Sequence, residues 1–211
     1  MEQSVRHVYL VRHGETDMNR QERLQGHIDC ELNDTGLKEA ELSHTLFERA
    51  GISFDRVYSS PLKRAVKTAS VISGGKEVIS EPLIMEMAFG DYEGRPYTEI
   101  DKGMWAFFHD PENVTPPACV EPTRKLQERT AQFIDRLRYE SDKNVLVVTH
   151  GIALRAILSS ILPDGEQALA WKLPITNCIV YSFDIADGTI TNVVHNKPLS
   201  INAEGDTSGK F

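Results

Sequence analysis

The sequence predicts an α/β protein, a three-layer α/β/α sandwich with a largely parallel central sheet. Two apolar runs, at residues 8–11 and 145–148, are typical of strands that are buried on both faces. Each is followed further along the chain by a segment with helical periodicity. Strands that alternate with helices favour a parallel sheet covered by helices on both sides.

The first half of the chain alternates strands and helices after the first apolar run. Asp34 or Thr35 is expected to cap the first long helix. Ser60 is expected to cap the next, because Pro61 follows at the position where proline commonly starts a helix. The expected strands are 8–11, 56–60 and 77–83, and the expected helices are 34–50 and 61–73.

The second half begins with a segment of different composition. Residues 84–122 combine aromatic residues, acids and prolines, and we interpret them as a lid insertion with a short helix near 97–108. We expect the aromatic side chains to form mainly the lid's own small core, although they would also suit an apolar leaving group. The expected later elements are a helix at 122–140, a strand at 145–148 with a helix after it, and a hairpin of 179–185 with 189–194. Residues 1–196 are predicted to form one domain, and 197–211 a polar tail.

Composition excludes several classes of partner. The formal net charge is −8, which argues against nucleic acid or an anionic membrane as the main partner. There is no apolar run of about 18 residues and no secretory signal pattern. Cys30, Cys119 and Cys178 form no CxxC pair, so we expect reduced thiols and a cytoplasmic location. Edge strands of the predicted sheet are compatible with a homodimer, but no feature of the sequence requires one.

Two of the expected strands end in the same way. VYLVRHG and VLVVTHG each place an apolar run before one polar residue, a histidine and a glycine. One such histidine would be interpreted most simply as a strand cap. Two, His13 and His150, at matching positions of a parallel sheet indicate a shared site, because ligands bind at the carboxyl ends of strands. Gly14 and Gly151 allow the backbone to turn there.

Positive charge gathers around the same point. Arg12 precedes His13, and Arg64 lies early in a helix whose side chains tilt back toward the strand edge. A lone Arg64 would be an ordinary surface residue, but two guanidinium groups with two imidazoles suit a phosphate group. A neutral imidazole can attack phosphorus, and the leaving oxygen then needs a proton donor. Glu86, just after a predicted strand, is the candidate donor.

Five motifs in order resemble those of the histidine phosphatase superfamily, the phosphoglycerate-mutase-like enzymes: VRHGETDMN, RLQG, YSSPLKRAVKTA, EMAFGDYEG and VTHG. The resemblance implies an α/β/α sandwich and a phosphohistidine intermediate, with no metal and no cofactor. It implies that His13 is the nucleophile and that Glu86 is the proton donor. By the same resemblance, the phosphate is held by Arg12, Asn19, Gln25, Gly26, Arg64, His150 and Gly151.

We favour hydrolysis of a small phosphorylated metabolite over phosphoryl transfer. Mutases of the family carry a paired-arginine stretch that grips a carboxylate, whereas this chain has no Arg-Arg and its lid offers only Arg95 and Lys102. A 2,3-bisphosphoglycerate-dependent phosphoglycerate mutase and a non-catalytic phosphate-binding module remain the alternatives. A metal-dependent hydrolase fits less well, because the histidines lack HxH or HExxH spacing. Residues 118–122 replace a Pro-Gly-Gly-Glu-Ser stretch of many phosphatase members, and we expect this departure to border the pocket.

Overall fold

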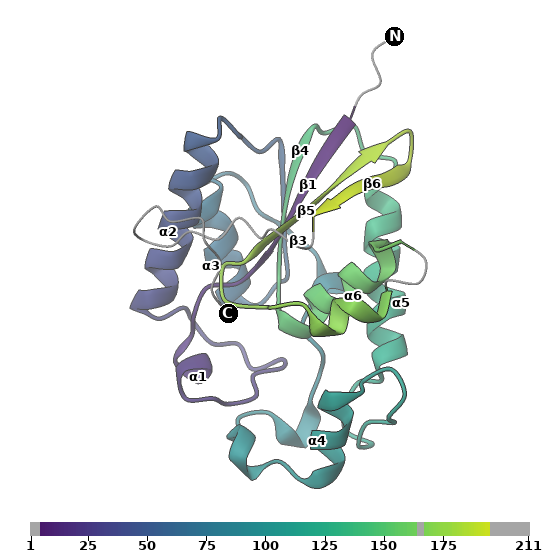
Figure 1. Ribbon diagram of the computed structural model, residues 1–211. Coiled ribbons are helices and arrows are strands. Elements are labelled where there is room, and N and C mark those ends of the chain that lie inside the picture. The colour runs from purple at the N-terminus through teal and green to yellow at the C-terminus, as the bar shows by residue number, and fades with distance from the viewer. Residues whose placement is uncertain (1–4, 164–166, 195–211) are drawn as a thin grey trace.

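The computed structural model describes residues 5–163 and 167–194 (Figure 1). The strands are β1 (Val5–Arg12), β2 (Arg56–Ser59), β3 (Ile79–Ser80), β4 (Asn144–Thr149), β5 (Val180–Ala186) and β6 (Thr189–Val194). The α-helices are α1 (Asp17–Arg20), α2 (Asp34–Arg49), α3 (Lys63–Ile72), α4 (Lys102–His109), α5 (Thr123–Leu137) and α6 (Gly151–Ile161). The 3₁₀ helices are η1 (Pro82–Ile84), η2 (Gly90–Tyr92), η3 (Tyr97–Glu99) and η4 (Gln167–Lys172).

The six strands form one sheet in the order β3-β2-β4-β1-β5-β6. β1, β2, β3 and β4 run parallel, whereas β5 pairs with β1, and β6 with β5, in the antiparallel sense. The predicted α/β fold is therefore confirmed. Because β1, β4 and β2 are adjacent and parallel, their carboxyl ends meet at one edge of the sheet.

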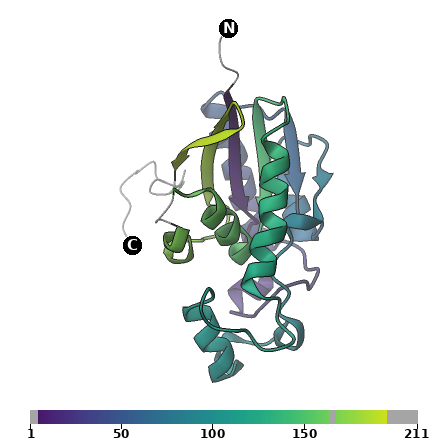
Figure 2. The same ribbon diagram turned by 90° about the vertical axis from the view of Figure 1, so that its right-hand side faces the viewer.

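Helices cover both faces of this sheet, with α2 and α3 on one side and α5 and α6 on the other (Figure 1). The apolar residues of β4 divide between the two faces. Val145 and Val147 pack with α5 and α6, and Leu146 and Val148 pack with α2 and α3. All four are fully buried, as a central parallel strand requires. Figure 2 shows α5 lying along the sheet, with the lid beyond one end of it.

The lid has its own apolar core, as expected from its aromatic residues. Phe89, Tyr92, Met104 and Phe107 are buried together and pack against Leu126 of α5 and two alanines of α6. The helix expected near 97–108 is split into η3 and α4. The break falls at Asp101, whose side chain accepts a hydrogen bond from the backbone N–H of Met104 at 3.0 Å and caps α4.

Two predicted helix caps are wrong by one or more residues. Asn33, rather than Asp34 or Thr35, caps α2 and accepts from the N–H of Gly36 at 2.9 Å. Ser60 does not cap α3, which begins at Lys63 with Leu62 as its N-cap. The reason is that the N–H of Ser60 still bonds to the carbonyl of Val148 at 3.0 Å, so Ser60 belongs to the sheet edge.

The strand expected at 77–83 is reduced to Ile79–Ser80. Glu81 ends it by capping η1, its carboxylate accepting from the N–H of Leu83 at 2.9 Å. The closing hairpin is confirmed, and Asp187 and Gly188 at its turn both have positive φ, 49° and 74°. The predicted tail 197–211 lies outside the described residues. None of the helices in the described part of the chain is both long and apolar enough to cross a bilayer.

Candidate active site

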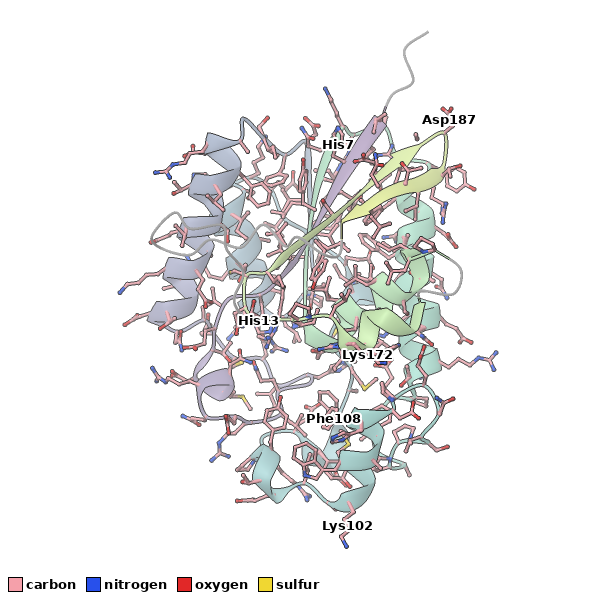
Figure 3. All side chains as sticks on the ribbon, viewed as in Figure 1. His7, His13, Lys102, Phe108, Lys172 and Asp187 are labelled. Carbon is pink, nitrogen blue, oxygen red and sulfur yellow. The ribbon has the colours of Figure 1, made fainter. Side chains whose placement is uncertain are left out.

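A cavity of about 210 Å³ opens at the carboxyl ends of the parallel strands, on the side that faces the lid. Figure 3 shows His13 at this end of the sheet. His150 lies next to His13, with ring centroids 5.1 Å apart, because Arg12 and Thr149 are register partners of β1 and β4. We call this cavity the phosphate cavity, after the ligand that the sequence predicts for it. Its wall includes eight predicted residues: Arg12, His13, Asn19, Gln25, Gly26, Arg64, Glu86 and Gly151.

His13 is held in one orientation by its own backbone. Its Nδ1 lies 2.7 Å from the carbonyl oxygen of Gly14, so Nδ1 carries the proton and donates it there. Nε2 therefore keeps its lone pair. Burial, followed by the charges of Arg12 and Arg64, lowers the pKa of His13 well below its usual value. His13 is consequently a neutral imidazole at physiological pH.

His150 is completely buried, and Ser60 orients it. Its Nε2 lies 2.7 Å from the hydroxyl oxygen of Ser60, and its Nδ1 has no partner among the described residues. Burial lowers the pKa of His150 well below its usual value, and the charge of Arg64 lowers it further. The hydroxyl of Ser60 was expected at a helix cap but instead fixes this ring.

Arg64 is fully buried and Arg12 is half-buried, and both cations have hydrogen-bond donors to spare. Arg64 donates from Nη1 to the carbonyl of Ile28 at 2.6 Å and from Nη2 to that of Gly26 at 2.8 Å. Arg12 donates from Nη1 to the carbonyl of Ile175 at 2.5 Å. The Nε atoms of both are buried without a partner in the described part of the chain. Because unpaired buried donors are costly, two such guanidinium groups favour an anion between them.

The loop after β1 presents two amides to the cavity. Thr16 and Asn19 form a capping box at α1, which fixes the Asn19 side chain. The Oε1 atom of Gln25 accepts from the hydroxyl of Thr16 at 3.0 Å and from the thiol of Cys30 at 3.1 Å. The Gln25 amide is thereby oriented with its NH₂ group available to an anion in the cavity.

Glu86 also lines the cavity and is oriented by backbone amides. Its Oε1 accepts from the N–H groups of Met87 at 2.9 Å and Ala153 at 3.0 Å. Its Oε2 accepts a longer bond, 3.2 Å, from the N–H of Ile152. The first turn of α6 therefore holds this carboxyl group, and Oε2 is the oxygen with capacity left for a further proton or bond.

A second layer fixes the backbone around Glu86. The Nη atoms of Arg129 donate to the carbonyls of Leu83, Met85 and Glu86 at 2.7–2.9 Å, and Arg129 makes a bidentate pair with Glu121. The Nε2 atom of His27 lies 2.8 Å from the same Glu86 carbonyl. Within residues 5–163 and 167–194, no group of three or more His, Cys, Asp or Glu side chains is placed to hold a metal ion.

The sequence profile of the histidine phosphatase superfamily (branch 1) matches residues 8–198. The chain belongs to this superfamily. The match spans both strand-end histidines and every residue of the phosphate cavity, so the resemblance inferred from the five motifs is confirmed.

Relatives of this histidine phosphatase are phosphatases and mutases. It is 32% identical to the adenosylcobalamin/alpha-ribazole phosphatase of Salmonella typhimurium, over 90% of this chain and 95% of that one. It is 32% identical to the 2,3-bisphosphoglycerate-dependent phosphoglycerate mutase of Thermoplasma acidophilum, over 86% and 88%. The crystal structure of phosphoserine phosphatase from Entamoeba histolytica in complex with 3-phosphoglyceric acid matches with TM-score 0.76 and 27% identity, over 92% and 97%. The predicted enzyme class, phosphatase, is confirmed.

Several residues of the histidine phosphatase's cavity were missed by sequence reasoning. Arg155 lies one turn into α6 and faces the cavity, a position that the VTHG motif and helical spacing together would have indicated. Lid residues have no such signal, because their placement depends on the fold of the insertion. The missed residues of the wall are Arg23, Leu24, Phe89, Tyr97, Phe108, Ile152, Arg155 and Ile175.

The altered stretch 118–122 does not line the phosphate cavity, contrary to expectation. Val120 is buried in the lid core instead. Glu121 affects the cavity only indirectly. It pairs with Arg129, which holds the backbone of Glu86, and it accepts from the N–H of Ala88 at 3.3 Å. Cys119 packs so closely on Gly90 that a Cβ there would lie 2.3 Å from the Cys119 carbonyl oxygen. The stretch thus shapes the lid rather than the cavity wall.

Proposed function

We propose that this histidine phosphatase hydrolyses phosphomonoesters of small metabolites through a phosphohistidine on His13, without a metal ion. The observation that carries the proposal is the state of His13. Its Nδ1 is committed to the Gly14 carbonyl, its Nε2 lone pair is free, and its low pKa keeps it neutral beside Arg12 and Arg64. A neutral imidazole beside two guanidinium groups is suited to attack a bound phosphoryl group.

In the first step the Nε2 of His13 attacks phosphorus, an N–P bond forms, and the P–O bond to the leaving group breaks. Glu86, protonated on Oε2, gives its proton to the departing oxygen. The phosphoryl oxygens accept from Arg12 and Arg64, whose unpartnered Nε–H groups match that charge. His150, Asn19 and Gln25 complete the proposed set of contacts, together with the backbone of Gly26. Gly151 leaves room for the phosphate, because a Cβ there would lie 3.7 Å from both Arg12 Nε and Glu86 Oε2.

In the second step water attacks the phosphohistidine. The Glu86 carboxylate removes a proton from that water, the N–P bond breaks, and His13 returns to its neutral form with phosphate released. The amides of Met87, Ile152 and Ala153 support this role, because they hold the carboxyl group at one place in both steps.

The test is phosphate release in EDTA from p-nitrophenyl phosphate and a panel of phosphometabolites that includes phosphoserine and 3-phosphoglycerate. We expect turnover that survives EDTA and is lost in His13→Ala. With a ³²P-labelled ester, acid-labile and base-stable label is expected on the wild-type chain and not on the variant. Loss of turnover in EDTA, or full turnover by His13→Ala, would overturn the proposed mechanism.

Phosphoglycerate mutase activity is the second candidate, because one relative at 32% identity carries that name. The lid cations give it little support. Arg95 lies over the ring of Tyr92, 5.2 Å from its centroid, and Lys102 is at the far tip of the lid (Figure 3). Phosphoryl transfer between phosphoglycerates that exceeds hydrolysis would favour the mutase.

We also propose a reducing compartment such as the cytoplasm, which the three free cysteines support.

A further inference from the structure

A second and larger cavity adjoins the phosphate cavity. Its volume is about 580 Å³, against about 210 Å³, and the two share Phe108, Ile152 and Arg155 as a common wall. Beyond that wall it runs between the end of the lid helix and η4, where it is lined by Trp171 and Lys172. Figure 3 shows Phe108 on the lid and Lys172 on the body at this junction, whereas Lys102 points away from it.

The sizes of the two cavities indicate different tasks. Small-molecule sites usually measure about 300–1,000 Å³. The phosphate cavity, about 210 Å³, is below this range, so it suits a phosphoryl group with at most a short leaving group. The second cavity, about 580 Å³, lies within the range and begins where the phosphate cavity ends.

The walls of the second cavity are aromatic near the shared boundary. Phe108, Ile152 and Trp171 are partly buried, and each packs against the lid core. The Nε1 atom of Trp171 is buried without a partner among the described residues. Such a surface offers stacking to a planar group and one N–H donor to a hydrogen-bond acceptor on it.

The charges of the second cavity are divided between body and lid. Arg155 and Lys172 come from the body, and Asp110 and Glu112 come from the lid. Within the described residues Arg155 donates only from Nη1, to the carbonyls of Trp171 and Ala170, so the rest of its guanidinium remains available at the shared wall. A negative group on a bound molecule is therefore favoured on the body side, away from the two lid carboxylates.

We propose that the second cavity is a leaving-group site for phosphomonoesters whose leaving group is planar and apolar and carries its own negative charge at the far end. The inference rests on the proposed phosphatase function. With the phosphoryl group among Arg12, His13 and Arg64, the leaving group passes the shared wall and lies against Trp171. Its negative end then reaches Lys172.

The experiment compares three esters: 2-naphthyl phosphate, 6-carboxy-2-naphthyl phosphate and phosphoserine. The two naphthyl esters have the same planar body and differ in the negative group, and phosphoserine has a short leaving group. We expect Trp171→Leu to lower kcat/KM for both naphthyl esters by about 3–10-fold, from lost stacking, with phosphoserine changed less than about twofold. Lys172→Ala is expected to lower kcat/KM only for the carboxylated ester, by about 2–5-fold.

The lid provides matched controls for both variants. Trp105, the other of the two tryptophans, is 42% exposed and lines neither cavity, so Trp105→Leu should leave all three rates unchanged. Lys102→Ala should do the same. Trp171→Phe, which keeps an aromatic ring, should restore most of the naphthyl activity if stacking is the cause.

The outcomes separate the inference from the function on which it rests. A wild-type enzyme that releases no phosphate from any ester would defeat the proposed function. Turnover of phosphoserine but not of the naphthyl esters would overturn the leaving-group site alone. The leaving-group site would also be overturned if Trp171→Leu lowered all three rates in parallel, or if Lys172→Ala lowered the rates of the two naphthyl esters equally.

Discussion

At the scale of the residue, His13 and His150 are two neutral imidazoles beside the buried Arg64 and the half-buried Arg12. Burial is the largest cause of the lowered pKa of each, and Arg64 contributes to both. The rings are only 5.1 Å apart, so adding a proton to either one would place a third charge beside Arg12 and Arg64. The arrangement that suits nucleophilic attack therefore makes the folded state sensitive to acid.

Stability is expected to fall below pH 6.5 because of these two histidines. The unfolded histidine has a pKa of about 6.5, and both folded values are lower, so below about pH 6.5 the unfolded chain binds protons that the folded chain does not. The unfolding free energy should be independent of these groups above that pH. Below it, each histidine should cost up to about 1.4 kcal/mol per pH unit. Urea unfolding from pH 7.5 to 5 measures this slope.

His13→Gln should reduce the dependence of the unfolding free energy on pH by up to about 1.4 kcal/mol per pH unit, the effect of one proton, because glutamine does not titrate. His109→Gln is the comparison, since this exposed residue at the end of α4 lies outside the phosphate cavity. Equal slopes for wild type and His13→Gln would show that His13 is not a buried neutral imidazole.

Glu86→Gln tests the proposed proton donor. Glutamine keeps an oxygen for the amides of Met87 and Ala153 but carries no transferable proton. We expect kcat for an alkyl phosphate such as phosphoserine to fall by about 10²–10⁴-fold, the usual contribution of general acid–base catalysis. With p-nitrophenyl phosphate the rate of the first step should fall much less, because p-nitrophenolate can leave without a proton. In single-turnover measurements of the first step, which exclude the later attack of water, a parallel loss of rate on both esters would indicate a binding role instead.

The sequence predicted the residues whose positions follow from strand register. Arg12, His13 and His150 end adjacent parallel strands, so an apolar run and the residues after it suffice to bring them together. Arg129 could not be found in this way. Its side chain donates to carbonyls of residues 43–46 positions earlier in the chain. No pattern in the sequence around Arg129 indicates these partners.

At the scale of the element, α5 and α6 together define where Glu86 lies. α6 begins at Gly151 and offers the amides of its first turn to the carboxylate, and α5 carries the arginine that holds the preceding backbone. The sequence predicted both helices but gave the start of α3 wrongly. Ser60 and Pro61 together are typical of a helix start, but the N–H of Ser60 bonds to the carbonyl of Val148 in the sheet. That strand lies almost ninety residues away in the sequence, so the local pattern could not indicate the bond.

Arg129→Lys should impair the chemistry without unfolding the protein. Lysine keeps the charge opposite Glu121 but has no planar fork to hold three carbonyls. A displaced Glu86 should lower kcat for phosphoserine by about 10–100-fold, because small misplacements of catalytic groups are costly. KM should change little, and p-nitrophenyl phosphate should be affected less than phosphoserine, since it needs less help from a proton donor.

Arg124→Lys on the same helix is the matched control, because Arg124 is 89% exposed and pairs only across one turn with Glu128 in the described structure. It should behave as wild type. If Arg129→Lys lowered the rate of the first step equally for both esters in a single turnover, or lowered the melting temperature enough to explain the loss, the arginine would be structural only.

At the scale of the whole molecule, the core of the lid includes residues from two helices of the sandwich. The buried lid residues Met104 and Phe107 belong to the same cluster as Leu126 of α5 and Ala153 and Ala156 of α6. An insertion that packs on two helices of the sandwich cannot lose its core without exposing theirs. A single domain that includes the lid stays a prediction, which chain length suggested and which unfolding experiments can test.

Phe107→Ala should therefore destabilise the entire chain in one transition. Phe107 is 1% exposed, and removing a buried phenyl ring usually costs about 3–5 kcal/mol. Urea unfolding followed by tryptophan fluorescence, far-UV circular dichroism and remaining phosphatase activity should give coincident curves shifted to lower urea. Trp105→Ala, two positions earlier on the exposed face of α4, should shift the curves by less than about 0.5 kcal/mol. If activity were lost in an earlier transition while the helical signal persisted, the lid would be a separate folding unit, and Phe107 would stabilise the lid without stabilising the sandwich.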